Sequence, residues 1–134
     1  MSKIKKCSDK TKTQIITTFL EILNTVKLYH WETKTYSIHK ATDDLKEKLE
    51  LNIDRFVEIL LGKCQTRINL IQSRIKLIDV KKNGIIKQKL FEYKRFLSDF
   101  SMIFNARTDG DLLSVRDDIL GDINQFLYLL SFHS

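Results

Sequence analysis

The chain has 134 residues, 43% of them apolar and 30% charged, with no proline and only four glycines. This length suits one domain with its own hydrophobic core. So few turn-forming residues exclude a sandwich or barrel of many short strands and favour long helices. No apolar run reaches the roughly 20 residues of a membrane-spanning helix, and the N-terminus lacks the apolar segment of a signal peptide. We therefore expect a cytoplasmic protein with no membrane partner.

The two cysteines indicate the redox environment. Cys7 and Cys64 are too few for a disulfide framework, so the sequence predicts a reducing, intracellular compartment. We expect Cys7 to lie in a mobile tail and Cys64 to be buried as a structural residue.

The net charge of +6 is unevenly distributed, because the first twelve residues hold five lysines and one aspartate and so carry +4. We call residues 1–12 the basic arm. A basic arm on a nearly neutral body is typical of proteins that touch nucleic acid, although a lysine-rich terminus can also serve solubility alone. The candidate DNA-binding residues are Lys3, Lys5, Lys6, Lys10 and Lys12.

Apolar residues at intervals of three and four predict a first helix from about residue 12 to residues 31–34. The polar, β-branched segment 33–37 predicts a break. A second helix should start near residue 39 and continue to about residue 63. Ser37 is the expected N-cap of this helix, and Gly62 is placed to end it.

The second half of the chain begins with residues 64–83, which fit neither the helical nor the strand period. We expect a packed connector there with one short helix. A third helix is predicted over residues 85–105, and a turn at 108–110 precedes a fourth over 111–132. The fold class is therefore all-α, a four-helix bundle over residues 13–134 that follows the basic arm and has a long connector between its second and third helices.

Four polar residues of the second helix have the spacing of metal ligands: His39, Asp43, Asp54 and Glu58. They form two i,i+4 pairs, and eleven residues return to within about 20° of one direction, so all four share one stripe. Histidine with carboxylate suits Fe(II), Mn or Zn. At 1.5 Å per residue, Asp43 and Asp54 lie about 16 Å apart, too far to share one ion. An antiparallel second chain would join the two pairs, which predicts a metal site at a dimer interface.

A histidine and a tryptophan, His30 and Trp31, stand near the end of the first helix. His-Trp followed by His-x3-Asp-x10-Asp-x3-Glu resembles the Dps family, the DNA-binding mini-ferritins of starved cells, over about residues 20–62. The resemblance implies a ferritin-like bundle and a ferroxidase centre shared between two subunits. Its iron ligands would be His30, His39 and Asp43 of one chain and Asp54 and Glu58 of the other, with Trp31 as the aromatic neighbour.

The resemblance also implies what the assembled protein would do. Fe(II) would be oxidised by peroxide or oxygen and stored as ferric mineral inside a dodecameric shell, and DNA would bind the basic arm. Asp109 and Asp111 would line the pores through which iron enters. Short, lysine- and isoleucine-rich relatives look similar to proteins of large DNA viruses. Such an origin would place the chain in the virion or the infected-cell cytoplasm instead of a cellular cytoplasm or nucleoid.

Plainer interpretations of these residues stay open. The acids of the second helix alternate with lysines, as on a solvated, salt-bridged face. His30 could be a hydrogen-bonded residue at a helix end, and Trp31 a core anchor. The alternative function is thus a non-enzymatic structural or DNA-condensing protein, associated with a virion if the chain is viral. No nucleophile–base pair, glycine-rich phosphate loop or CxxC motif is present, so any enzymatic activity would be metal redox chemistry.

Overall fold

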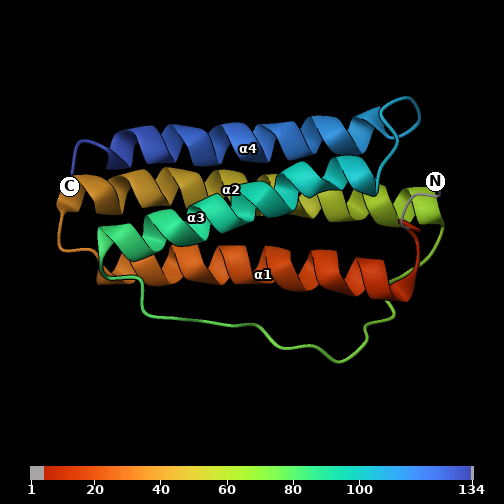
Figure 1. Ribbon diagram of the computed structural model, residues 1–134, viewed down its shortest axis with the longest axis horizontal. Coiled ribbons are helices and arrows are strands. Elements are labelled where there is room, and N and C mark those ends of the chain that lie inside the picture. The colour runs from red at the N-terminus through yellow and green to blue at the C-terminus, as the bar shows by residue number, and fades with distance from the viewer. Residues whose placement is uncertain (1–4, 134) are drawn as a thin grey trace.

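The computed structural model describes residues 5–133 and contains four α-helices and one short 3-10 helix, with no strand in that range (Figure 1). The predicted all-α fold of four helices with a long connector is confirmed. No helix among the described residues is long and apolar enough to cross a membrane. The elements are α1 (Asp9–Glu32), α2 (Tyr36–Cys64), α3 (Asn83–Ser98), η1 (Asp99–Met102) and α4 (Gly110–Leu130).

The order of the helices gives the bundle two different ends (Figure 1). Helices α1 and α2 are antiparallel and are joined by residues 33–35. The connector then returns along α1, so α3 runs parallel to α2, and α4 runs back antiparallel to α3. We call the end with residues 33–35 and the C-terminus the loop end. The opposite end, where α1 begins and α2 stops, is the disulfide end.

Aromatic side chains fill the middle of the bundle. The rings of Phe19, Phe56 and Phe100 are fully buried, and the ring centroid of Phe100 lies 5.2 Å from that of Phe56 and 5.9 Å from that of Phe19. Phe96 and Phe104 extend this cluster through mostly edge-to-face contacts, an arrangement that aromatic rings favour. These rings form an apolar core, and the interior also holds a buried hydrogen bond of 2.9 Å between the hydroxyls of Thr25 on α1 and Tyr93 on α3.

Helix α1 begins earlier than predicted. The hydroxyl of Ser8 accepts a hydrogen bond from the backbone N–H of Thr11 at 3.1 Å and caps the helix, which begins at Asp9, three residues before Lys12. Residues 9–12 of the basic arm are therefore helical. Helix α1 therefore runs across the position after residue 12 where we placed the boundary between arm and bundle.

Helix α2 also differs at both ends. Its N-cap is Thr35, two residues before the expected Ser37, and the helix passes through Gly62 to Cys64. The left-handed residue is Gln65, with φ 51°, so the helix ends there and not at the glycine. The predicted third helix stops at Ser98 and gives way to η1, and α4 ends at Leu130.

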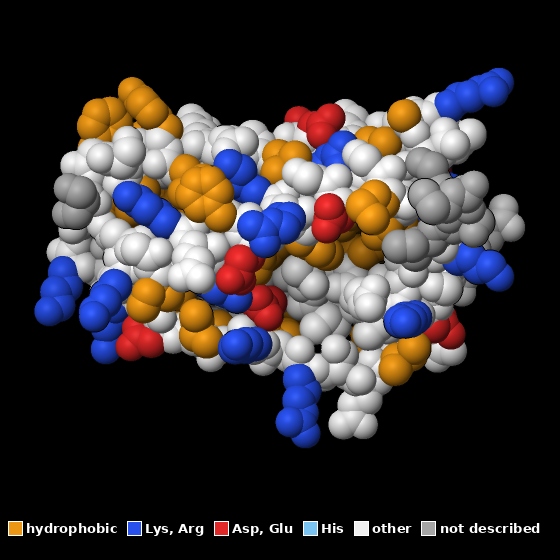
Figure 2. All heavy atoms as spheres, in the orientation of Figure 1, with side chains coloured by type: hydrophobic (Ala, Val, Ile, Leu, Met, Phe, Trp, Pro, Cys, Tyr) orange, Lys and Arg blue, Asp and Glu red, His pale blue; other side chains and the backbone are white. Residues whose placement is uncertain are grey.

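The connector is extended throughout residues 66–81, and the short helix expected there is absent. Its backbone N–H groups find acceptors on α1: Ile71 donates to Thr13 at 3.0 Å, Lys76 to Glu21 at 3.3 Å, and Val80 to Glu32 at 3.2 Å. Because α1 satisfies these backbone donors, the connector needs no helix of its own. Figure 2 shows lysine and arginine side chains projecting along the edge where the connector runs. Its exposed cations are Arg67, Arg74, Lys76, Lys81 and Lys82.

Candidate metal centre

The three-residue loop at 33–35 brings the end of α1 against the start of α2. His30 and His39 therefore face each other, with ring centroids 3.8 Å apart and planes inclined by 21°. Asp43 lies one turn further along α2, and its Oδ1 is 3.4 Å from Nε2 of His30. One ligand atom from each of the three lies within 4.8 Å of the others. Within residues 5–133, this is the one group of three or more such side chains that could hold a metal ion.

Hydrogen bonds orient both imidazole rings. Nδ1 of His39 lies 2.9 Å from the backbone carbonyl of His30, which can only accept, so this nitrogen carries the proton. The hydroxyl of Thr42 donates to the carbonyl of His39 at 2.7 Å, and its oxygen then accepts from Nδ1 of His30, also at 2.7 Å. In each ring the acceptor at Nδ1 leaves Nε2 as the nitrogen that is available to a metal ion. Histidine metal ligands are commonly oriented in this way, by an acceptor that binds the ring nitrogen facing away from the ion.

The environment of the three side chains suits partial enclosure of an ion. His30 is buried, with 7% of its surface exposed, and His39 and Asp43 are half-buried. Two imidazoles and one carboxylate match the ligand set of open non-haem Fe(II) sites, and the same donors accept Mn and Zn. The arrangement therefore offers three ligand side chains for a divalent ion and would leave further coordination positions free.

The other predicted site residues lie outside this group. Asp54 and Glu58 are exposed on α2, about 16 Å and 22 Å further along the helix than Asp43 at 1.5 Å per residue. Trp31 is 66% exposed, and the ammonium of Lys27 stands 5.3 Å above its ring. Trp31 is therefore not a core anchor in the single chain. Within one chain, the structure brings together His30, His39 and Asp43 and leaves Asp54 and Glu58 apart.

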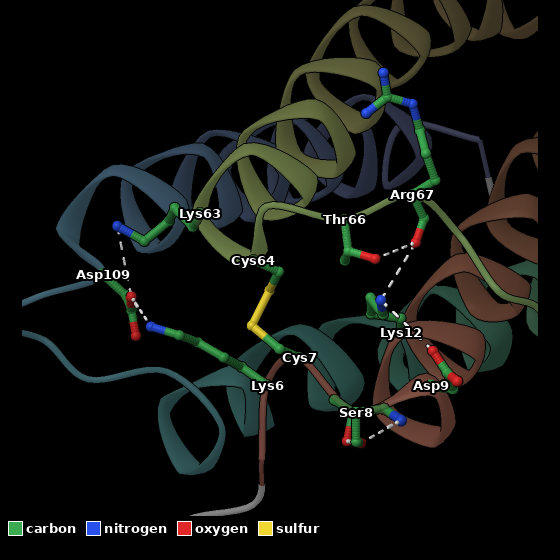
Figure 3. The surroundings of a disulfide bond; sticks show 11 residues. Lys6, Cys7, Ser8, Asp9, Lys12, Lys63, Cys64, Thr66, Arg67 and Asp109 are labelled. Carbon is green, nitrogen blue, oxygen red and sulfur yellow. Dashed lines mark hydrogen bonds and ion pairs between the residues drawn. A yellow bond between two sulfur atoms is a disulfide. The ribbon is translucent and has the colours of Figure 1, made fainter.

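The cysteines and the basic arm differ most from expectation (Figure 3). Cys7 and Cys64 form a disulfide with a Cα–Cα distance of 5.6 Å, so our expectation of two separate thiols was wrong. The sequence did not reveal the pairing because only the fold brings the start of α1 to the end of α2. Cys7 itself is exposed and Cys64 is half-buried.

The lysines of the basic arm have different surroundings. Lys12 is buried, and its ammonium donates to the carbonyl of Arg67 at 3.4 Å and lies 3.6 Å from Asp9. Lys6 is bound to Asp109 at 2.6 Å (Figure 3). Lys5 and Lys10 are exposed, whereas Lys3 lies outside the described residues.

The two candidate pore residues are engaged within the chain. Asp109 is only 1% exposed, and its carboxylate binds Lys6, Lys63 and the backbone N–H of Asn105. Burial acts to raise the pKa of Asp109, but the hydrogen bonds from Lys6 and Asn105 and the two ammonium charges together hold it below its usual value. Asp111 is exposed and pairs with Lys63 at 3.2 Å. In the single chain, neither aspartate presents an unpaired carboxylate to solvent.

Sequence reasoning missed one residue of the candidate metal centre. Thr42 is fully buried and joins the carbonyl of His39 to the ring of His30. Its signal in the sequence is weak: a threonine three residues after one candidate ligand and one before the next. A threonine inside a helix commonly donates its hydroxyl hydrogen to a carbonyl of the preceding turn. Here the same hydroxyl oxygen also accepts a hydrogen bond from the ring of His30.

Comparison with known proteins identifies one family. The chain belongs to DUF5856, a family of unknown function whose model matches residues 30–130. The matched range begins at His30 and includes every candidate ligand, whereas the basic arm and Cys7 precede it. The chain matches no curated protein and no solved structure.

Proposed function

We propose that this protein is a Dps-like mini-ferritin that binds Fe(II) as its substrate, oxidises it and stores the ferric product. The observation that carries the proposal is the convergence of His30, His39 and Asp43, with an acceptor at Nδ1 of each histidine that leaves its Nε2 available to a metal ion. The order of the helices also supports it, since a bundle with one long crossover between its second and third helices is the connection found in ferritin-like folds.

A second copy of the chain would complete the site. Three protein ligands leave an iron centre open, and the carboxylates of Asp54 and Glu58 lie on the same stripe of α2 as His39 and Asp43. Tyr36 and Leu51 on or beside this stripe are 74% and 71% exposed, so they offer apolar surface that a second copy would bury. An antiparallel copy would cover them and bring its Asp54 and Glu58 to the first chain's histidines, giving two equivalent sites.

The chemistry follows from the ligands. Two Fe(II) ions give one electron each to hydrogen peroxide, which takes up two protons and leaves as two water molecules; oxygen is the alternative oxidant. Carboxylates suit this reaction because they bridge hard ions and tolerate the increase in charge from Fe(II) to Fe(III). The neutral histidines hold the ion from one side, while Asp43 supplies the negative charge within the same chain.

The test is iron oxidation by a variant that lacks the distant carboxylates. Purified protein is loaded with Fe(II) without oxygen, its mass is measured by light scattering, and peroxide is then added while Fe(III) absorbance is followed. Asp54→Asn with Glu58→Gln should lose rapid oxidation and keep the helical fold. The matched control is Asp44→Asn with Asp118→Asn, which removes two exposed carboxylates outside the stripe and should oxidise iron as the native chain does.

The outcomes separate the two functions under consideration. A shell-sized oligomer with oxidation that depends on Asp54 and Glu58 supports the mini-ferritin. Unchanged oxidation in the double variant would overturn the shared site. A small oligomer that fails to bind iron in proportion to its chains would move the assignment to the structural or DNA-condensing alternative.

A specific observation favours DNA binding as the second candidate function. The disulfide end gathers exposed cations from three segments: Lys5 before α1, Lys10 in the first turn of α1, and Arg67 in the connector just after α2. A cluster of this kind supplies the non-specific, salt-dependent part of DNA binding. The test is the double variant Lys5→Gln with Lys10→Gln, which should weaken binding to duplex DNA. The control is Lys34→Gln with Lys40→Gln at the loop end, which should weaken binding less. Equal loss in both pairs would contradict a localised surface.

A further inference from the structure

We propose that the Cys7–Cys64 disulfide is a redox latch: its reduction releases the basic segment before α1, residues 5–8, and thereby strengthens binding to duplex DNA. This inference rests on the proposed DNA-binding function and concerns the regulation of that surface. It requires that the disulfide holds the segment, that the bond is accessible, and that the segment carries cations the oxidised protein withholds.

The disulfide is the main attachment of this segment. Residues 5–8 precede α1, and apart from the Cys7–Cys64 bond their long-range contact is the ion pair of Lys6 with Asp109. This ion pair is one attachment through a long, partly exposed lysine side chain, and the entropy cost of ordering that side chain offsets part of its attraction to the buried carboxylate of Asp109. From Ile15 onwards, by contrast, α1 is held by core side chains. Opening the disulfide therefore frees the segment and leaves the bundle packed.

The bond is accessible to a reductant. Cys7 is exposed, and Figure 3 shows the disulfide joining the segment to α2 with Lys6 beside it. The thiolate of a dithiol attacks one sulfur, and the other cysteine leaves as a thiolate. The second thiol of the reductant then displaces the first cysteine, so that the protein gains two electrons and two protons and the dithiol becomes a disulfide. Hydrogen peroxide reverses the change by taking two hydrogens from the thiols and leaving as two water molecules.

In the oxidised protein, part of the segment's positive charge is unavailable to DNA. Lys6 is neutralised by Asp109, and the disulfide holds its neighbours against an end of the bundle that also carries Asp9 and Asp111. Release leaves Asp109 paired with Lys63 and with the N–H of Asn105, so no buried carboxylate loses all its partners. The freed segment can then follow a phosphate backbone, and each further phosphate that its lysines neutralise steepens the dependence of binding on salt.

The experiment compares the oxidised protein, the dithiol-reduced protein and Cys7→Ser with Cys64→Ser. Hydrogen exchange reports release at the N–H groups of Ser8 and Thr11, which are bonded to Lys5 and Ser8 in the oxidised chain. Fluorescence anisotropy with a labelled duplex, across a salt series, reports binding. We expect faster exchange, tighter binding and a log–log salt slope that is steeper by about 0.9 for each additional phosphate neutralised.

A lysine substitution shows whether the released segment is responsible. Lys6→Gln should weaken DNA binding of the reduced protein and leave that of the oxidised protein nearly unchanged, because Lys6 is already paired there. Lys34→Gln, an exposed lysine at the loop end, should have the same effect in both redox states.

Each result is decisive. Unchanged exchange on reduction overturns the latch, whatever the DNA data show. Faster exchange without tighter binding overturns the link between the latch and DNA. If neither redox state binds DNA, the proposed DNA-binding function fails as well, while the iron proposal is untouched because it rests on the loop end.

Discussion

Removal of the Cys7–Cys64 disulfide should lower the free energy of unfolding by about 4 kcal/mol. The two cysteines are 57 residues apart in sequence, and the bond closes a loop that contains nearly all of α1 and α2. In the chain-entropy account, a loop of this length restricts the unfolded chain by roughly 14 cal/mol/K at 25 °C, so the bond contributes about 4 kcal/mol. Since domains of this size are stable by about 5–15 kcal/mol, the reduced protein should still fold.

Urea denaturation of the oxidised and reduced protein, followed by circular dichroism, measures this difference. Cys7→Ser with Cys64→Ser should match the reduced native chain and show no further response to a dithiol, which controls for reduction itself. A steeper dependence on urea is also expected after reduction, because the open chain exposes more surface when it unfolds. A loss below about 1 kcal/mol would refute the loop-closure argument. Complete unfolding on reduction would refute the inference that the core folds without the disulfide.

Three further predictions follow from single side chains. Thr42→Val should lower the affinity for Co(II) about 10–100-fold in a spectroscopic titration and preserve the fold, because the acceptor that orients His30 is lost; unchanged affinity would remove Thr42 from the site. Phe56→Ala should cost about 3–5 kcal/mol in thermal or urea unfolding, since its fully buried ring meets three others. The pKa of Asp109 is lowered in the fold, so its ionised form stabilises the protein above the usual aspartate range, and this contribution disappears as the pH falls through the folded pKa. Asp109→Asn should flatten the acid limb of a plot of stability against pH, and an unaltered limb would count against the Lys6 pair.

Apolar periodicity was enough to predict the helices, because the residues that set it became the core. Ile15, Phe19 and Val26 are all buried in α1 as their spacing indicated. The ends were harder to place, since they depend on single hydrogen bonds and backbone conformations. Gly62 looked like a terminator, yet the helix continues until Gln65 adopts the left-handed conformation.

Contacts between segments that lie far apart in the chain could not be predicted from the sequence. A lysine in a charged tail looks solvated, but Lys12 is buried because α1 starts early and the carbonyl of Arg67 lies beside it. The extended connector likewise depends on acceptors along α1 that have no local signature. The candidate ligands His30 and His39 were chosen from spacing and resemblance, and the structure places them together. That these histidines form a site together with carboxylates of a second chain stays a prediction.

The separation of the two bundle ends means that they should behave as independent units. Helix α1 alone has 24 residues, so about 36 Å lie between the disulfide and the histidines, with the aromatic core between them. Substitutions this far apart, without shared neighbours, usually have additive effects. A chain that has lost its cysteines should therefore keep its metal affinity, and one without its histidines should keep its redox response. Genetic dissection could then remove either property from an otherwise intact protein.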